Sequence, residues 1–342
     1  MITLQQIARA AGCSLATVSY ALRSDPRIRQ KTRSRVQAVA ARLGYRPNPR
    51  FSALMSHIRN SRPVATGERI AFVWVHTPRA ESTKDPFLQR VFHGANIRAD
   101  ALGYRLEQFW TADRGMTDRR LSQVLKSRGI VGVLLSPVMH EAEVTLDVEW
   151  SCFAPAVIGS ARWNPELHHA GHHHFLAMRL ALRELEKCGC RRPAGIIDAD
   201  TNERAKRAWE AAFLAHHPSP ASARKLVRVW TVENLADAAA WFIRSKADAL
   251  IVSDTALLET PGLRAACRAR GARIATLHWR ADTPPEIGGV DQSYDQIAAQ
   301  AVDLVAAQLN ANETGVPPWP HMLLFPGRWV DSRKRKNVKG AT

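Results

Sequence analysis

A run of histidines is the stretch of this chain whose residue types are most suited to binding a metal ion. The segment HHAGHHH, His168–His174, holds five of the thirteen histidines of the 342-residue sequence. His168 and His172, like His169 and His173, are four residues apart, which on a helix would place each pair on one face and allow it to bind a divalent cation. An Ala-Gly break separates the pairs, and no glutamate completes an HExxH motif. We therefore expect a solvated loop, with a metal-dependent hydrolase centred on this cluster as the alternative.

Other signs of catalysis are missing from the sequence. It contains no glycine-rich phosphate loop, no G-x-S-x-G and no convincing Ser/His/Asp spacing. The cysteines are odd in number and scattered, which favours reduced thiols over a disulfide framework; they are Cys13, Cys152, Cys188, Cys190 and Cys267. No second pair completes a zinc site with Cys188 and Cys190. We expect no catalytic residue, no metal and no cofactor.

Positive charge is concentrated at the amino terminus. The chain has a formal net charge of +17, and residues 1–62 contribute +11 of it through twelve Lys and Arg against the single acid Asp25. The other 280 residues carry 36 basic and 30 acidic side chains, and the tail SRKRKNVKGAT takes most of that excess. A strongly basic head on a nearly neutral body indicates binding to a polyanion, with a solvated basic face as the alternative.

The same amino-terminal region predicts three helices. A first helix over 4–11 ends at Gly12, a second runs over 15–22, and a third covers roughly 31–43. Thr3 and Ser14 can cap the first two helices. In the second helix one side is apolar and fits a core, while Leu15, Ala16, Ser19 and Tyr20 lie on another side. This is a helix-turn-helix, whose second helix enters the major groove of DNA.

From residue 69 onward apolar strands alternate with helices. The segments RIAFVWV, YRLEQFW, GVLLSP, APAVIGS, RPAGIID, ADALIVS and ARIATLHW have strand character, and helical patterns lie between them. Such alternation predicts parallel sheets covered on both faces, and the length suits two such sheets with a cleft between them. No stretch approaches the roughly 18 apolar residues of a membrane span, so we expect a cytoplasmic protein without a membrane partner.

The head resembles the DNA-binding domain of the lactose/galactose repressor (LacI/GalR) family. TLQQIARAAGCSLATVSYALRSDPRIRQKTRSRVQAVAARLGYRPN is similar to the family pattern T-x-x-D-V-A-x-x-A-G-V-S-x-x-T-V-S-x-x-L-N, followed by K-T-R-x-x-V and L-G-Y-x-P-N, without a break over about 45 residues. Gln6 stands where the family often has Asp, and Arg29 where it often has Ser. More weakly, GIVGVLLSP, APAVIGS, RELEKCGCRRPAGII and FPGRWVDSR look like landmarks of the family's effector domain, which has the fold of periplasmic sugar-binding proteins.

The resemblance implies which residues contact DNA. It places Leu15, Ala16 and Tyr20 at base-reading positions and Thr17 and Ser19 near phosphates. Leu15 and Ala16 would recognise thymine methyl groups or the shape of the DNA, and the Tyr20 hydroxyl can form a hydrogen bond with a base. The alternative is that Leu15 and Tyr20 pack on a neighbouring helix. The remaining DNA-contact positions that it implies are Thr3, Ser14, Arg29, Thr32, Asn48, Ala53 and Leu54.

Ala53 and Leu54 belong to the segment PNPRFSALMSHIRNSRP, which matches the family's hinge. There an apolar side chain enters the minor groove and unstacks a base step. An ordinary linker helix is the alternative. The expected organisation is a small all-α helix-turn-helix head over 1–47, a hinge over 48–62, a two-lobed α/β effector-binding and dimerisation domain over 63–332, and a basic tail over 333–342, which lacks an apolar heptad repeat for tetramerisation.

The resemblance also carries over a set of effector-binding positions. These are Pro86, Phe87, Ser136, Arg204, Ser253, Asp254, Trp279 and Arg280. The family usually has Asn-Asp at 253–254 and Asp at 280. Arg280 stands where the family has an acid, and this difference argues against a pocket for a neutral sugar. A carboxylated ligand such as a uronic acid suits Arg204 and Arg280.

The function expected from these observations is that of a transcriptional regulator, a repressor. It would bind a pseudo-palindromic double-stranded operator as a homodimer and respond to a small-molecule effector, a sugar or sugar acid. The alternatives are the metal-dependent hydrolase, a non-specific architectural DNA binder, and a regulator whose pocket has lost its ligand.

Overall fold

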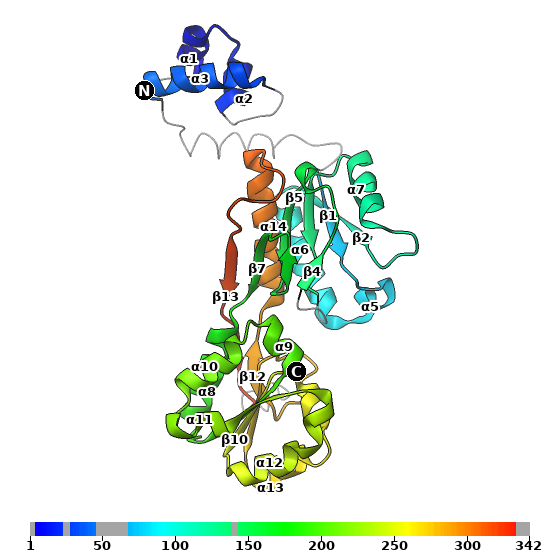
Figure 1. Ribbon diagram of the computed structural model, residues 1–342, viewed down its shortest axis with the longest axis vertical. Coiled ribbons are helices and arrows are strands. Elements are labelled where there is room, and N and C mark those ends of the chain that lie inside the picture. The colour runs from blue at the N-terminus through cyan, green and yellow to red at the C-terminus, as the bar shows by residue number, and fades with distance from the viewer. Residues whose placement is uncertain (1–3, 23–27, 46–67, 139–142, 333–342) are drawn as a thin grey trace, which may run out of the picture.

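Three short helices form the amino-terminal head of the protein (Figure 1). The computed structural model describes residues 4–22, 28–45, 68–138 and 143–332. The head helices are α1 (Leu4–Ala11), α2 (Leu15–Leu22) and α3 (Gln30–Arg42). Their buried side chains share one small core, made of Ile7, Ala8, Ala11, Val18, Ala21, Val36 and Ala40. The first two helices have the predicted bounds, and the three-helix prediction is confirmed.

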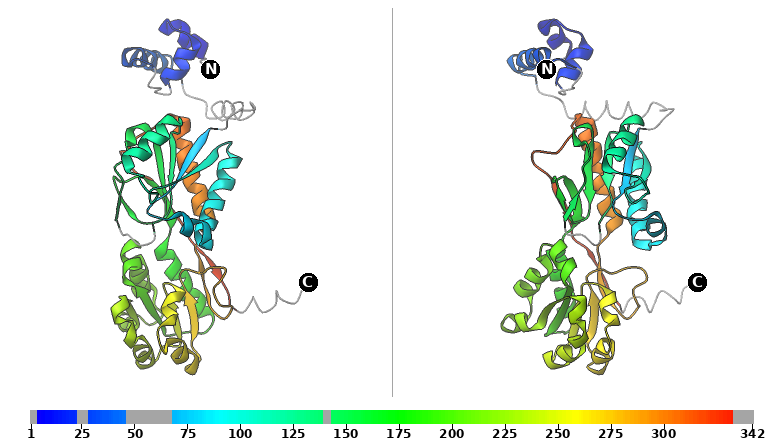
Figure 2. Two further views of the ribbon diagram at one scale, coloured as in Figure 1. Left: turned by 90° about the vertical axis from the view of Figure 1, so that its right-hand side faces the viewer. Right: turned by 45° about the vertical axis from the view of Figure 1, so that its right-hand side comes forward.

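The rest of the described chain folds into two lobes, each built on a six-stranded sheet (Figures 1 and 2). Lobe 1 has the strand order β2-β1-β3-β5-β7-β13, and all of its pairs are parallel. Its strands are β1 (Arg69–Trp74), β2 (Arg105–Trp110), β3 (Gly132–Leu135), β5 (Ala154–Ile158), β7 (His168–His172) and β13 (Met322–Phe325). Its helices are α5 (Arg79–Lys84), α6 (Pro86–Ala101), α7 (Asp118–Ser127) and α14 (Tyr294–Ala311). A two-stranded ribbon, β4 (Glu143–Thr145) and β6 (Arg162–Asn164), and the short helix η1 (Trp150–Cys152) complete the lobe.

Lobe 2 repeats this strand order as β9-β8-β10-β11-β12-β14. Its strands are β8 (Pro193–Asp198), β9 (Val227–Trp230), β10 (Ala249–Val252), β11 (Arg273–Thr276), β12 (Gly288–Asp291) and β14 (Arg328–Val330). Its helices are α8 (His174–Lys187), α9 (Ala199–Arg204), α10 (Ala208–His216), α11 (Pro220–Leu226), η2 (Val232–Asp237), α12 (Ala238–Ser245), η3 (Thr255–Glu259) and α13 (Leu263–Ala269). Only the edge pair β12–β14 is antiparallel. Two parallel-sheet lobes were predicted from the alternation of strands and helices, and that prediction is confirmed.

Both faces of the lobe 1 sheet are covered, as the apolar strands require. Along β1, Ile70, Phe72 and Trp74 enter the core under α6 and α14, while Ala71 and Val73 enter the core on the α7 side. A strand buried on both faces is apolar throughout, which explains why RIAFVWV has no polar alternation. Among the described helices, none combines the length and apolar character needed to cross a membrane.

The chain passes between the lobes three times (Figure 2). The crossings are 172–174, 291–294 and 325–328, each lying between the end of one element and the start of the next. Arg90 on α6 ties lobe 1 to the second crossing, because its guanidinium contacts Asp291 at 2.8 Å and Asp295 at 2.5 Å. The three crossings form a compact hinge, the geometry by which two-lobed proteins open and close.

The histidine run lies at the first crossing, so the prediction of a solvated loop is wrong. His168–His172 is β7, paired with β5 and β13, and α8 begins at His174. His172 is only 1% exposed. The residues form a strand because both neighbours in the sheet offer backbone partners, and this pairing is not visible in the spacing of the histidines.

Candidate DNA-binding head and inter-lobe ligand site

The helix-turn-helix is held in shape by a cap at the start of its second helix. Ser14 Oγ accepts a hydrogen bond from the Thr17 backbone N–H at 3.1 Å and lies 2.8 Å from Thr17 Oγ1. Val18 and Ala21 are fully buried, so the opposite side of α2 is the one that faces away from the head core. Tyr20 is half-buried. The cap and the core together fix the direction of the helix that would enter the major groove.

The described part of the head carries cations and no acidic side chain, since residues 4–22 and 28–45 contain no aspartate or glutamate. Arg9, Arg29, Lys31, Arg35 and Arg42 are all exposed. Exposed cations without internal partners are free to contact phosphates, which is the electrostatic basis of DNA affinity.

The structure describes only some of the residues that are predicted to contact DNA. Ser14, Thr17, Tyr20, Arg29 and Thr32 lie on the described head, with Thr32 half-buried near the start of α3. The described part of the chain does not include the side chains of Leu15, Ala16 and Ser19. It also does not include the whole predicted hinge or the residues Thr3, Asn48, Ala53 and Leu54.

A cavity of about 110 Å³ lies between the two lobes, next to the chain crossings. Lobe 1 contributes the starts of α6 and α14 and two loops after strands, and lobe 2 contributes α8, α9, α10 and loops at the carboxyl ends of its strands. The lining residues are Phe87, Pro137, Val138, Gly159, Ser160, Ala161, His174, Thr201, Arg204, Trp209, Ser253, Asp254, His278, Gln292 and Tyr294. This is where ligands gather in open parallel sheets.

One end of the cavity is cationic. Arg204, the last residue of α9, donates to Thr201 Oγ1 at 3.0 Å but forms no ion pair with a carboxylate among the described residues. Burial lowers the pKa of Arg204 from its ordinary value. The rings of His174 and Trp209 pack edge-to-face, 4.8 Å between centroids, and burial lowers the pKa of His174 to about 4. Burial also raises the pKa of Tyr294 to about 12, so its phenol stays neutral.

At the other end a carboxylate orients an imidazole. His278 Nδ1 lies 3.1 Å from Asp254 Oδ2. Burial alone would raise the pKa of Asp254, but hydrogen bonds from His278 and from the Ala256 backbone N–H hold it below its ordinary value. The Phe87 ring packs edge-on against the rings of His278 and Tyr294, with centroid distances of 5.3 Å and 4.8 Å, and gives the cavity an aromatic side.

Three buried polar atoms of the lining have no hydrogen-bond partner: Ser160 Oγ, Trp209 Nε1 and His278 Nε2. Buried polar groups in proteins are hydrogen-bonded in the great majority of cases. Their concentration around one cavity therefore marks it as the candidate ligand site.

Four of the eight predicted effector positions line the cavity: Phe87, Arg204, Ser253 and Asp254. The other four are not among its lining residues. Pro86 starts α6, Ser136 accepts a hydrogen bond from the Val75 backbone N–H, Trp279 donates its backbone N–H to the Val290 carbonyl, and Arg280 contacts Asp85 and Asp282.

Arg280 differs most from the expectation of a ligand-binding cation. Its guanidinium lies 3.9 Å from Asp85, which caps α6 in lobe 1, and 3.5 Å from Asp282. Two carboxylates therefore face this cation, whereas Arg204 forms no ion pair with a described carboxylate, although the charges of Asp198 and Asp200 act to raise its pKa.

The lining also contains residues that sequence reasoning did not select. They are Pro137, Val138, Gly159, Ser160, Ala161, His174, Thr201, Trp209, His278, Gln292 and Tyr294. His278, which lines the cavity, directly precedes the predicted position Trp279, whose own side chain is not in the lining. His174 was noticed only as part of a metal-like cluster, and no group of three His, Cys, Asp or Glu side chains in the described chain is placed to hold a metal ion.

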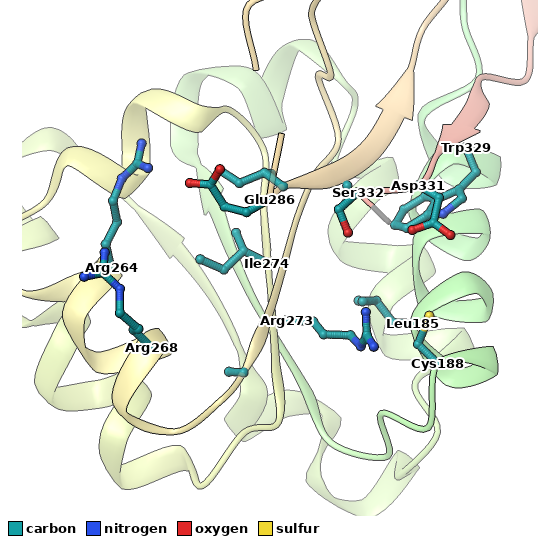
Figure 3. A pocket seen from close by; sticks show the side chains of 13 residues that line it. Leu185, Cys188, Arg264, Arg268, Arg273, Ile274, Glu286, Trp329, Asp331 and Ser332 are labelled. Carbon is teal, nitrogen blue, oxygen red and sulfur yellow. The ribbon is translucent and has the colours of Figure 1, made fainter. Parts of the chain in front are cut away.

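A second cavity, of about 290 Å³, lies within lobe 2 beside the starts of β11 and β12 (Figure 3). Arg264 and Arg268 lie on the α13 side, whereas Arg273 points toward Leu185 and Cys188. The arginines therefore do not converge on one point, and Arg264 is already paired with Glu259 at 2.6 Å. The larger cavity lacks the focused polar arrangement of the inter-lobe site.

The protein combines a helix-turn-helix head with a two-lobed body of parallel sheets, an architecture that it shares with solved transcriptional regulators. Residues 3–48 match the family model described as "Bacterial regulatory proteins, lacI family". The match covers the head, so the head is similar to the DNA-binding domain of that family.

Individual proteins agree with this assignment. The HTH-type transcriptional regulator PtxS of Pseudomonas plecoglossicida is 29% identical over 142 residues, which are 41% of this chain and 38% of the relative, so the match spans well under half of that relative. Two solved structures share the fold: a transcriptional regulator CelR-cellobiose complex (TM-score 0.53, 17% identity, 97% of this chain and 99% of that one) and a Lac repressor dimer bound to operator and an anti-inducer (TM-score 0.50, 16% identity, 96% and 98%). All three are transcriptional regulators rather than enzymes.

Proposed function

We propose that this protein is a sequence-specific transcriptional regulator, a repressor that binds a pseudo-palindromic operator as a homodimer. The observation that carries the proposal is the helix-turn-helix, whose second helix is capped by Ser14 and whose surface carries exposed cations. This domain matches the family model of the lacI regulators and is joined to a two-lobed body. A two-fold symmetric dimer places two such heads on successive half-sites, so its operator is symmetric. Curated names and solved structures of DNA-binding regulators support this proposal.

Within the head we assign base reading to Leu15, Ala16 and Tyr20 and phosphate contacts to Thr17, Ser19 and the exposed cations. Leucine and alanine side chains discriminate by contact with thymine methyl groups, and a tyrosine hydroxyl can donate to or accept from a base edge. The remaining proposed contacts are Thr3, Ser14, Arg29, Thr32, Asn48, Ala53 and Leu54. We retain the division into a head over 1–47, a hinge over 48–62, an effector and dimerisation domain over 63–332 and a tail over 333–342, acting in the cytoplasm.

Control by a small molecule, a sugar or sugar acid, follows from the position of the inter-lobe cavity. A ligand between the lobes contacts both, so it changes the balance between open and closed arrangements of the three crossings. It alters DNA affinity only to the extent that it binds one arrangement more tightly than the other. The cellobiose and anti-inducer complexes of similar fold support a ligand-binding role for the body.

The proposal is tested by selecting the purified protein on a randomised duplex library. We expect a two-fold symmetric sequence that binds at least ~1000-fold more tightly than a scrambled duplex, the lower range of specific DNA recognition. Tyr20→Phe, which removes only the hydroxyl, should weaken binding to the selected sequence and leave the scramble unchanged; Arg244→Gln, an exposed change on α12, is the control. Equal binding to both duplexes with the same steep salt dependence would instead make the head a non-specific clamp.

A further inference from the structure

One edge of the lobe 1 sheet is apolar and uncharged. β13 is the outermost strand of that sheet and pairs with β7, and among the described residues no strand pairs with its other side (Figure 1). Edge strands are normally protected from pairing by charged side chains or prolines. Residues 314–327 contain no Lys, Arg, Asp or Glu, and β13 itself contains no proline, because Pro320 and Pro326 lie just outside it.

Exposed apolar side chains gather on this edge. Of the eight large apolar side chains that are exposed in the described part of the chain, four lie between residues 316 and 324: Val316, Trp319, Met322 and Leu324. Trp319 is 83% exposed and stands between two prolines, which restrict its backbone. Met322 and Leu324 project from one face of β13, whereas Leu323 and Phe325 pack on the core. A patch of this kind is typical of a protein–protein contact.

The backbone of β13 presents hydrogen-bonding groups outward at two positions. The carbonyls of His321 and Phe325 accept hydrogen bonds from backbone N–H groups on the β7 side, at 2.9 Å and 2.8 Å. Because successive residues of a strand alternate in the direction of their backbone groups, Met322 and Leu324 direct their N–H and C=O away from β7. A further strand at this edge would therefore bond to Met322 and Leu324.

We propose that β13 pairs antiparallel with β13 of a second copy across a two-fold axis, so that the lobe 1 sheets of the two copies become continuous. Two hydrogen-bonded edge strands that a two-fold axis relates must run antiparallel. With Leu323 at the centre, Met322 of each copy lies opposite Leu324 of the other. These two residues exchange backbone hydrogen bonds, and their side chains meet on one face. Pro320 and Pro326 are equally far from Leu323 along the chain, so they bound the paired segment symmetrically.

A second copy fits this edge better than a charged partner does. The segment offers no charge that would attract DNA or an acidic or basic protein. Self-pairing covers the apolar side chains and satisfies the outward backbone groups with their own equivalents. The exposed parts of the four side chains amount to roughly 400 Å² per copy, about half of what one partner contributes to a standard interface, so we expect weak association with a Kd in the micromolar range.

The direction of the strands separates this contact from the pairing of two heads on one operator. β1 starts at Arg69, where the chain arrives from the head, and β7 and β13 end at the crossings into lobe 2. The strands of this sheet are parallel, so all of them run toward lobe 2. Antiparallel pairing therefore attaches the heads at opposite ends of the assembly. The inference thus goes beyond the proposed function, since it joins operator-binding units to one another.

The test is sedimentation velocity of the full-length protein between about 1 and 100 µM, the range in which a micromolar contact dissociates. We expect a species that doubles in mass as the concentration rises. Leu324→Lys buries a charge in the contact and should weaken this association at least about 10-fold. Leu324→Met keeps the edge apolar and should retain the association. Ile243→Lys is the matched control, because Ile243 is an exposed apolar residue on α12 of lobe 2.

Cysteine cross-linking tests the register. In Leu323→Cys the two introduced thiols lie directly opposite each other and within reach of a disulfide, whereas in Leu324→Cys each thiol lies opposite Met322. With diamide as oxidant, Leu323→Cys should form a cross-linked pair on a non-reducing gel. Leu324→Cys and the wild type, with its own five free cysteines, should not form this pair.

Three results would overturn the proposal. The first is a wild-type mass that stays constant over the concentration range, and the second is association that is equally strong in Leu324→Lys. The third is loss of operator selection by Leu324→Lys together with its association, because the contact would then belong to the operator-binding dimer itself. Thermal melting verifies that each variant folds, and the wild-type measurement decides the question even if one does not. Retained operator selection by Leu324→Lys is the expected result.

Discussion

Replacement of His174 should flatten the loss of stability that this protein undergoes in mild acid. The imidazole packs against Trp209 and lines the cavity, and burial lowers its pKa from about 6.5 to about 4. An unfolded chain restores the ordinary pKa, so between these two values the unfolded state binds more protons than the folded state. The free energy of unfolding is therefore unaffected by this group above about pH 6.5 and falls as the pH is lowered toward 4.

The magnitude follows from the size of the shift. One pKa unit corresponds to about 1.4 kcal/mol, so the full displacement is worth at most about 3 kcal/mol, of which about 2 kcal/mol is already lost at pH 5. Water in the cavity reduces these values, because part of the ring faces it. His172, which is more deeply buried and whose pKa is also lowered, adds a contribution of the same sign that remains in the variant.

The assay is urea unfolding of the wild type and His174→Gln at several pH values between 7.5 and 4.5, followed by tryptophan fluorescence. The expected result is a pH dependence reduced by about 1–2 kcal/mol between pH 7 and 5, whatever the stability of the variant at pH 7. His93→Gln, an exposed change on α6, should follow the wild type. A His174→Gln curve parallel to that of the wild type would refute the buried, neutral imidazole.

Three further perturbations test the head, the hinge and the packing between helices. Ser14→Ala removes the side-chain cap of α2 and should lower the stability of the head by about 1 kcal/mol, measured by hydrogen exchange of α1–α3 amides; unchanged exchange would contradict the cap. Arg90→Gln leaves the nearly buried Asp291 with the Ser293 backbone N–H at 2.9 Å and with Arg328 at 3.6 Å as its remaining cation, and should cost about 1–2 kcal/mol in urea unfolding, after allowance for the partial exposure of Arg90. In Gly94→Ala a Cβ would meet the Asp295 backbone, so α6 and α14 must separate; a loss of about 1–3 kcal/mol and a lower Tm are expected, whereas His93→Ala on the same helix should have little effect. A Gly94→Ala protein as stable as the wild type would show that α6 and α14 are not in such close contact at this position.

The sequence by itself determined the parts of this protein that depend on local pattern. The bounds of α1 and α2 follow from caps, a glycine stop and apolar spacing within a few residues, and the charge of the head is a matter of composition. The alternation of strands and helices was sufficient for two parallel-sheet lobes, because parallel strands need a crossover and buried faces need apolar residues.

Only the tertiary structure decided what lies in the ligand cavity. His174, Trp209 and His278 come from separate elements of lobe 2, and Phe87 reaches them from lobe 1, so no spacing along the chain connects them. The same reason explains the two largest differences from expectation. The histidine run is a strand because β5 and β13 lie on either side of it, and Arg280 is occupied because Asp85, almost two hundred positions earlier in the sequence, faces it across the cleft. Whether a buried polar group has a hydrogen-bond partner within the protein depends on which residues folding places beside it.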